Sequence, residues 1–328
     1  MKYITHGNGG AADCIRLADG PVPVPMPGEI LIEVVCAGIN RPDVLQRSGR
    51  YPPPPDASPV LGLEVAGRIS AIGEGVTGLK VGAGVTALVP GGGYAEYCVA
   101  PAGQVLPIPE GMDWASAAAL PETWFTVWAN LVDLGHLKRG ERLLVHGGSS
   151  GIGLTAIQLA NHLDVECLVT VGNAEKAEFC RQQGVAHVVN YRDSDFAAEI
   201  KRLTNGEGID VILDMVGAPY LQRNLTLLRR DGRLVIIAFL EGSQAEIDLM
   251  PVMLKRLTIT GSTMRPRTLA EKRTIRDALV ANIWPKLSRG EMQPHIFARF
   301  PLDQAADAHR LMESSRHIGK IVLEVGTP

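Results

Sequence analysis

The pattern of hydrophobic positions changes near residue 122 of the chain. Before that point, short apolar runs rich in β-branched residues alternate with Gly and Pro turns, most clearly at 29–39, 64–73, 81–89 and 94–100. Regular spacing of this kind predicts a compact, barrel-like β-domain.

From residue 122 onward, short apolar runs alternate with helical stretches. Residues 121–135 predict a helix with Trp124, Val127, Trp128 and Leu131 on its apolar face. Strands are expected at 142–147, 166–172, 187–191, 209–217, 232–239 and 257–263, separated by helices at 151–163, about 174–183, 196–203 and 220–228. Six β-branched runs joined by helices imply a parallel sheet that is covered on both faces.

The last segment, from about residue 265, predicts two helices and a final strand at 319–325, which we expect to return to the first domain. The expected fold is therefore α/β with two domains. The β-domain takes residues 1–121 and 265–328, and a doubly wound parallel-sheet domain takes residues 122–264.

A glycine-rich turn lies between the first strand and first helix of the second domain. In RLLVHGGSSGIGLTA (142–156), Gly151, Gly153 and Ala156 match the G-x-G-x-x-[G/A] pattern of dinucleotide-binding proteins. Glycines there permit a tight turn and close approach to a pyrophosphate, which the helix N-terminus attracts. The expected phosphate-binding residues are Gly148, Ser149, Ser150, Gly151, Ile152 and Gly153.

The residues at the end of the second strand of this domain, expected at 166–172, indicate whether the dinucleotide is NADH or NADPH. NAD-binding chains usually carry Asp or Glu there, to bind the ribose 2′-hydroxyl. This chain has Gly172 and Asn173 instead, followed by Lys176, which could meet a 2′-phosphate. The sequence therefore favours NADPH. Lys176 could instead be a solvated helix charge, and Glu175 is the feature that argues against NADPH.

Composition excludes several partners. The 328 residues carry a net charge of −3 and no basic stripe, so neither nucleic acid nor an anionic membrane surface is expected. No apolar run is long enough to span a membrane, and the N-terminus lacks a signal-peptide pattern. Five scattered cysteines without a CxxC pair suggest reduced thiols and a cytoplasmic protein.

Several longer motifs resemble those of the medium-chain dehydrogenase/reductase superfamily, and within it the zinc-free quinone oxidoreductases of the p53-inducible quinone oxidoreductase-like branch. They include AGINRPDVLQRSGRYPPPP (37–55), LGLEVAGRISAIG (61–73), HGGSSGIGLTAIQLA (146–160) and HIGKIVLEV (317–325). The resemblance runs through nearly the whole chain and implies a GroES-like β-barrel catalytic domain joined to a Rossmann domain.

Zinc-bearing members of this family use a Cys, a His-Glu pair and a later Cys around the metal. At the corresponding positions this chain has Asn40 and the pair Leu63-Glu64. A carboxamide and a leucine cannot replace thiolate and imidazole ligands, so no metal is expected.

The resemblance also implies which residues bind NADPH. Gly172, Asn173, Lys176 and Tyr191 should face its adenine and 2′-phosphate, and Val216, Gly217, Ala238, Phe239 and Leu240 its nicotinamide half; Thr126, Asn40 and Lys320 complete the set. Two of these have a simpler alternative. Tyr191 could be a half-buried tyrosine at a strand end, and Thr126 a helix threonine bonded to its own backbone.

One short stretch of the first domain offers a site for the electron acceptor. Asn40, Asp43, Gln46 and Tyr51 are the expected catalytic residues, and the prolines at 52–55 stiffen the loop after Tyr51. Tyr51 could stack on a quinone ring, and the Asn40 amide could orient the acceptor. Asn40 could instead cap a turn, Tyr51 could be a surface residue, and Asp43 suits a helix cap or ion pair better than a base.

The resulting hypothesis is a zinc-independent NADPH:quinone oxidoreductase that transfers hydride in an interdomain cleft. The run 257–263 would be an exposed sheet edge unless it paired with a second copy, as it does in this family, so a homodimer is expected. Two alternatives stay open: reduction of activated C=C bonds in enals or enones, and a non-catalytic NADPH-binding role of the crystallin-like or RNA-binding kind.

Overall fold

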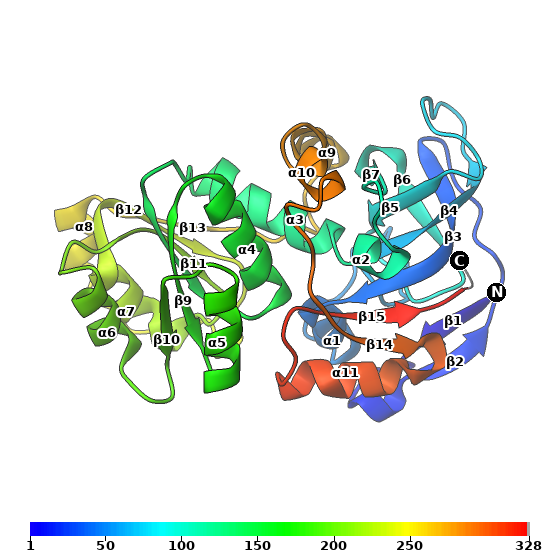
Figure 1. The fold of residues 1–328 in the computed structure, drawn as a ribbon. Helices are drawn as coiled ribbons and strands as arrows, with labels where there is room; N and C mark the ends of the chain where they lie inside the picture. The colour runs from blue at the N-terminus through cyan, green and yellow to red at the C-terminus, as the bar shows by residue number, and fades with distance from the viewer. Residues whose placement is uncertain (327–328) are drawn as a thin grey trace. The chain divides into compact units, whose positions relative to one another are not determined.

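The computed structural model describes residues 1–326, and the chain forms two compact units (Figure 1). Unit 1 contains Met1–Phe125 and the segment from Arg265 onward, and unit 2 contains Thr126–Met264. Unit 1 therefore extends a few residues past the expected boundary at residue 121. The reason is local, because the backbone N–H of Glu122 donates to the Glu64 carboxylate of unit 1 at 2.9 Å.

Unit 1 is built on a sheet around one long strand, and all of its strand pairs are antiparallel except β14 with β15, which is parallel. Strand β3 pairs with β15, β4 and β6, and the sheet order is β14-β15-β3-β4-β5-β7. The strands are β3 (Glu29–Ile39), β4 (Glu64–Ile72), β5 (Gly84–Leu88), β6 (Tyr97–Pro101), β7 (Val105–Pro107), β14 (Ile296–Pro301) and β15 (Lys320–Glu324), with β1 (Lys2–Thr5) and β2 (Arg16–Asp19) forming a small second sheet.

Helices of 5 to 14 residues accompany this sheet in unit 1. They are α1 (Arg41–Arg47), α2 (Trp114–Ala118), α9 (Leu269–Asn282), α10 (Trp284–Ser288) and α11 (Ala305–Ser314). The expectation of two helices after residue 265 was wrong, because there are three. Pro285 starts a new helix, α10, directly after α9 instead of continuing it.

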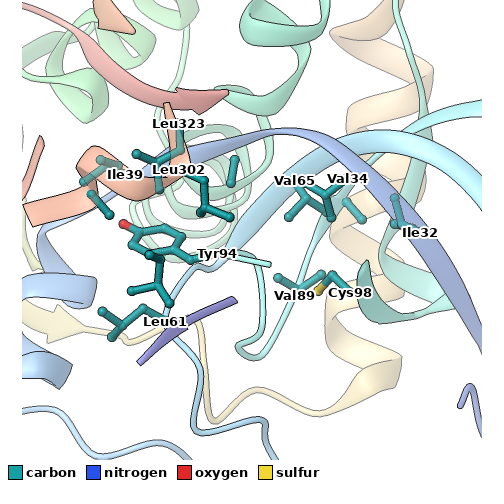
Figure 2. Packing of buried hydrophobic residues seen from close by; sticks show 14 of the residues in the cluster. Ile32, Val34, Ile39, Leu61, Val65, Val89, Tyr94, Cys98, Leu302 and Leu323 are labelled. Carbon is teal, nitrogen blue, oxygen red and sulfur yellow. The ribbon is translucent and has the colours of Figure 1, made fainter. Parts of the chain in front are cut away.

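The core of unit 1 contains a buried tyrosine. The Tyr94 ring is fully buried beside Ile39 and Leu61 (Figure 2). Its hydroxyl donates to the Asp43 carboxylate at 2.9 Å, which satisfies a polar group that would be costly to bury alone. Asp43 in turn accepts the backbone N–H of Asn40 at 2.8 Å, so the core fixes the start of α1.

Unit 2 confirms the predicted doubly wound sheet. Six parallel strands follow the order β10-β9-β8-β11-β12-β13, with α4 and α5 on one face and α6 and α7 on the other (Figure 1). The strands are β8 (Arg142–His146), β9 (Glu166–Val171), β10 (His187–Asn190), β11 (Ile209–Asp214), β12 (Leu228–Ile236) and β13 (Thr258–Gly261), and the helices are α4 (Gly151–His162), α5 (Ala174–Gln182), α6 (Phe196–Leu203), α7 (Ala218–Leu227) and α8 (Met250–Lys255).

Two helical details differ from expectation. The helix predicted over 121–135 is α-helical only in α3 (Pro121–Val127) and continues as a π-helical segment, Trp128–Leu134, in which the Gly135 N–H donates to the Asn130 carbonyl. Helix α8 lay in a stretch with no predicted helix. Among residues 1–326, no helix combines the length and apolar character that a membrane span requires.

Candidate active site

The glycine-rich turn of unit 2 connects β8 to α4. The Ser150 hydroxyl accepts the Gly153 N–H at 3.0 Å and caps the helix. A Cβ on Gly148 would lie 2.5 Å from Val169, and one on Gly153 would lie 2.4 Å from two turn carbonyls, so both positions require glycine. Ser149 is buried in the turn. Gly151 and Ile152 begin α4, where first-turn amides are available to a phosphate.

The residues expected to face a 2′-phosphate lie together. Asn173 caps α5, where its side-chain oxygen accepts the Lys176 N–H at 2.8 Å. The Tyr191 N–H donates to the Val171 carbonyl at 3.1 Å, which fixes the end of β10 beside the end of β9. A Cβ on Gly172 would lie 2.7 Å from the Tyr191 hydroxyl. The structure thus brings these four sequence-predicted residues to one place.

The loops after β11 and β12 are hydrogen-bonded to each other. The Leu240 N–H donates to the Met215 carbonyl at 3.1 Å, and the Glu241 N–H donates to the Val216 carbonyl at 3.0 Å. Gly217 has φ 92°, and a Cβ there would lie 2.5 Å from a carbonyl of the facing loop. The loop that begins with Ala238 exposes large apolar side chains, since Phe239 is 53% and Leu240 45% exposed.

Thr126 is the first residue of unit 2. It is half-buried in α3, and its carbonyl accepts the Asn130 side-chain N–H at 2.8 Å. This carbonyl therefore helps to anchor the π-helical segment that follows.

A chain of buried polar side chains begins under the glycine-rich turn. The Gly147 and Gly148 N–H groups donate to the Thr170 carbonyl at 3.1 and 3.0 Å. The Thr170 hydroxyl lies 3.0 Å from Nδ1 of His146, and Nε2 of His146 lies 2.8 Å from the Asn224 side-chain oxygen. Burial lowers the pKa of His146 to about 4, so the ring is neutral and donates from Nε2 to Asn224.

The same chain ends under the loop after β11. Nδ2 of Asn224 donates to Oδ2 of Asp214 at 3.3 Å, and Oδ1 of Asp214 accepts the Val216 N–H at 2.7 Å. Burial raises the pKa of Asp214 to about 6, yet the carboxyl is ionised above neutral pH. One continuous set of hydrogen bonds therefore links the glycine-rich turn to the loop at Val216 and Gly217.

In unit 1, Asn40 belongs to a buried ionic cluster. Its Nδ2 donates to Oε1 of Glu64 at 2.9 Å, and its Oδ1 accepts the Lys320 ammonium at 2.5 Å. The ammonium also donates to Oε1 of Glu64 at 2.7 Å and to the Ile39 carbonyl at 3.3 Å. The oxygen and the nitrogen of the Asn40 amide and all three protons of the Lys320 ammonium thus have partners inside unit 1. These hydrogen bonds hold the two side chains in place within unit 1.

Asp43 has the capping role that its place in the sequence suggested. It is fully buried and accepts hydrogen bonds from the Asn40 N–H, the Gly62 N–H and the Tyr94 hydroxyl. Burial raises the pKa of Asp43 to about 6. Next along this network, the Tyr94 hydroxyl lies 3.3 Å from Nε2 of His309, which is itself buried against Arg47.

Gln46 and Tyr51 are brought together by a third residue. Nη2 of Arg265 donates to Oε1 of Gln46 at 2.7 Å, and the same guanidinium lies 4.7 Å from the centre of the half-buried Tyr51 ring. The Lys272 ammonium donates to the Arg265 carbonyl at 2.9 Å. Burial raises the pKa of Tyr51, so its hydroxyl stays protonated and can donate.

Comparison with known proteins places this geometry in a family. The model for the alcohol dehydrogenase GroES-like domain matches residues 26–110, and the model for zinc-binding dehydrogenases matches residues 151–280. A quinone oxidoreductase of Lama guanicoe is 35% identical over 328 residues, which cover 98% of this chain and 97% of the relative. The chain belongs to the medium-chain dehydrogenase/reductase superfamily.

Solved structures of the superfamily share this fold. An Escherichia coli quinone oxidoreductase complexed with NADPH has a TM-score of 0.89 and 28% identity, and the match covers 99% of this chain and 100% of that one. The CurK enoyl reductase has a TM-score of 0.86 and 27% identity, covering 99% of both chains. They confirm the expected GroES-like unit and Rossmann unit in this medium-chain dehydrogenase/reductase.

The residues at the superfamily's zinc position do not fit the metal. Asn40 and Leu63 replace two ligands, and the Lys320 ammonium already binds Asn40 and Glu64 where a second cation would meet repulsion. Within residues 1–326, no group of three or more His, Cys, Asp or Glu side chains is placed to hold a metal.

Sequence reasoning missed several residues of this medium-chain dehydrogenase/reductase. Arg265, Glu122, His146 and Asn224 were not singled out. His146 lies inside the quoted motif 146–160, directly before the glycine turn, and this position was a usable signal. Asp214, which was also missed, lies inside the expected strand 209–217. Arg265 gave no such signal, because its contact with Gln46 joins positions 219 residues apart.

Replacing Lys320 by Met tests the ionic cluster. The Lys320→Met variant should lose about 3–5 kcal/mol of unfolding free energy, because the Glu64 carboxylate is left buried without a countercharge. Denaturant unfolding measures this loss. Lys286→Met, which removes a more exposed ion pair with Glu291, is the control and should cost less than about 1 kcal/mol. Adding Glu64→Gln should recover part of the loss, and a Lys320→Met protein as stable as the control would contradict the analysis.

Proposed function

We propose that the protein is an NADPH-dependent quinone oxidoreductase that needs no zinc. The observation that carries this proposal is the similarity to a quinone oxidoreductase along 98% of the chain, at 35% identity. The structural likeness to an NADPH-complexed quinone oxidoreductase supports the same cofactor. NADPH supplies the hydride when it is bound, and the protein contributes binding and orientation.

Unit 2 would hold NADPH along the carboxyl edge of its sheet. The α4 N-terminus at Gly151 offers backbone N–H groups to the pyrophosphate. Asn173, Lys176 and Tyr191 would bind the 2′-phosphate and adenine, and no carboxylate caps the end of β9 to compete with them. The coupled loops at Val216 and Phe239 would hold the nicotinamide half.

Unit 1 would position the acceptor. Tyr51 offers a protonated hydroxyl and an aromatic face, and Gln46 offers an amide. A quinone ring suits this combination, because it can stack on one group and accept hydrogen bonds from others. Asn40 and Lys320 hold the start of α1 in place, so they would influence the acceptor indirectly, by fixing the position of Gln46 in that helix.

A second candidate activity is reduction of an activated C=C bond. The match to the CurK enoyl reductase favours it, and the same hydride chemistry applies. A conjugated enal or enone would need only one oxygen to be bound, so the two activities differ in the acceptor and not in the cofactor.

We also propose that the protein works in the cytoplasm as a homodimer. All five cysteines are unpaired, as suits a reducing compartment. Strand β13 is the edge of its sheet, and Ile259 on it is 40% exposed. Beside it in the sequence, α8 and the residue before it expose Leu249, Met250, Met253 and Leu254, each more than half. An apolar edge of this kind favours pairing with a second copy.

Cofactor oxidation assays test the proposed activity. NADPH consumption should require an added quinone and persist in EDTA, and an enal in place of the quinone tests the second activity. NADPH should bind more tightly than NADH, and Lys176→Ala should reduce this preference about tenfold because it removes a charge from the 2′-phosphate site. Lys201→Ala, an exposed lysine on α6, is the control. Equal affinities for NADH and NADPH would refute the cofactor preference. A rate of NADPH oxidation that does not depend on quinone would refute the quinone reductase activity.

An Asp214→Asn variant tests the buried chain of unit 2. The amide offers only one acceptor oxygen where the carboxylate serves Val216 and Asn224, so the nicotinamide loop should loosen. Calorimetry should show NADPH affinity falling about tenfold while 2′,5′-ADP, which lacks the nicotinamide half, loses less than about threefold. The control is Asp210→Asn, at a buried aspartate in the same strand, which should change the affinities for NADPH and for 2′,5′-ADP by the same factor. Equal losses for both ligands in Asp214→Asn would contradict this role.

Light scattering tests the assembly. The wild type should have about twice the chain mass of 35.1 kDa at micromolar concentration. The double variant Met253→Lys with Ile259→Lys should be monomeric, because it places charges on the apolar edge. Val24→Lys, at a position of unit 1 that is 79% exposed, should leave the mass unchanged. A monomeric wild type would rule out the dimer.

A further inference from the structure

Arg265 carries a buried positive charge, and two of its three side-chain nitrogens have no hydrogen-bond partner within residues 1–326. The residue is 8% exposed, and only its Nη2 has a partner, the Gln46 side chain at 2.7 Å. Nε and Nη1 are buried and have no hydrogen-bond partner within residues 1–326. Arg265 also forms no ion pair in this described part of the chain. Unpaired donors on a buried charge are costly, so a partner from outside the chain is expected.

Two carboxyl groups, Asp43 and Glu122, interact with Arg265 through space, and neither forms an ion pair with it within residues 1–326. The Asp43 carboxyl already accepts hydrogen bonds from the Asn40 N–H, the Gly62 N–H and the Tyr94 hydroxyl. Burial and the neighbouring Glu64 raise the pKa of Glu122 to about 8. At neutral pH the Glu122 carboxyl is therefore mostly protonated and uncharged. The Lys272 ammonium, bound to the Arg265 carbonyl, adds a further positive charge. The region around Arg265 thus favours an anionic or strongly electron-rich oxygen.

The neighbours of Arg265 indicate which oxygen this is. Its guanidinium contacts the two residues placed at the acceptor, the Tyr51 ring at 4.7 Å and Gln46 at 2.7 Å. A planar acceptor held by Tyr51 and Gln46 would bring a carbonyl oxygen within reach of the unpaired N–H groups. Arginine keeps its charge at every working pH, unlike a lysine in the same place.

We propose that Arg265 is a catalytic residue that binds a carbonyl oxygen of the quinone and stabilises the negative charge that this oxygen acquires. This inference rests on the proposed quinone reduction. The quinone gains a hydride as the C4–H bond of NADPH breaks, which leaves NADP⁺ and the hydroquinone monoanion. The monoanion takes one proton from water to become the hydroquinone. A fixed donor is worth more for the developing anion than for the neutral carbonyl, so it lowers the barrier.

Removal and chemical rescue of the guanidinium test this assignment. In Arg265→Ala, kcat/KM for 1,4-benzoquinone should fall about tenfold to a thousandfold, as for other lost oxyanion donors. NADPH affinity, measured by fluorescence titration, should stay within threefold. Added guanidinium chloride at millimolar concentration should restore part of the rate. Arg267→Ala, the same charge change two residues along the same segment, should retain the wild-type rate and show no rescue.

A second readout separates charge stabilisation from a structural role. Across a series of quinones, the loss in Arg265→Ala should grow as the hydroquinone becomes more basic, because its anion depends more on the guanidinium. Arg265→Lys keeps the charge and should fall between wild type and Arg265→Ala. A uniform loss across the series without rescue, or full activity of Arg265→Ala, would overturn the assignment while leaving the quinone reductase function standing. Failure of the wild type to reduce any quinone would overturn both.

Discussion

The hydrogen bonds and the ion pair of the buried Glu64 carboxylate hold three segments of unit 1 together. The carboxylate accepts hydrogen bonds from the Lys320 ammonium, the Asn40 amide and the Glu122 backbone, which belong to β15, the start of α1 and the start of α3. A fully buried charge is tolerable only when its acceptor sites are filled, so these three segments must meet in one arrangement. The positions of Gln46, which lies in α1, and of Tyr51, which lies in the loop after α1, depend on that arrangement.

Two residues at positions that correspond to zinc ligands of the family, Asn40 and Glu64, bind the ammonium of Lys320. Zinc-bearing relatives bind a metal with a thiolate and an imidazole, whereas this chain presents an amide and a leucine and binds an ammonium on its own side chain. A covalently attached cation cannot leave or polarise a substrate as an open metal site can. In the mechanism that we propose, Arg265 stabilises the charge on the acceptor, because its Nε and Nη1 have no hydrogen-bond partner within residues 1–326.

Unit 2 contains a buried hydrogen-bond network that is made of neutral side chains and one carboxylate. A dinucleotide extends across several strand ends, so its two halves must be bound by loops at a fixed separation. The hydrogen bonds from Thr170 through His146 and Asn224 to Asp214 fix the two loops against the same strands. Because His146 is neutral and fully buried, its own hydrogen bonds to Thr170 and Asn224 do not change with pH near neutrality, whereas Asp214, with a pKa of about 6, becomes protonated as the pH falls below that value.

The sequence alone determined the parallel sheet, the glycine-rich turn before α4 and the absence of Cys and His at the positions of the family's zinc ligands. Each follows from local requirements: β-branched runs between helices, glycines where a Cβ would collide, and side chains that cannot ligate zinc. The helix break before Pro285, the π-helical segment and the partners of the buried charges were decided by the tertiary structure. Glu64 meets Lys320 across 256 residues, and Arg265 meets Gln46 across 219. No local pattern encodes such pairs, because desolvation selects a charge's partner only after packing has brought distant segments together.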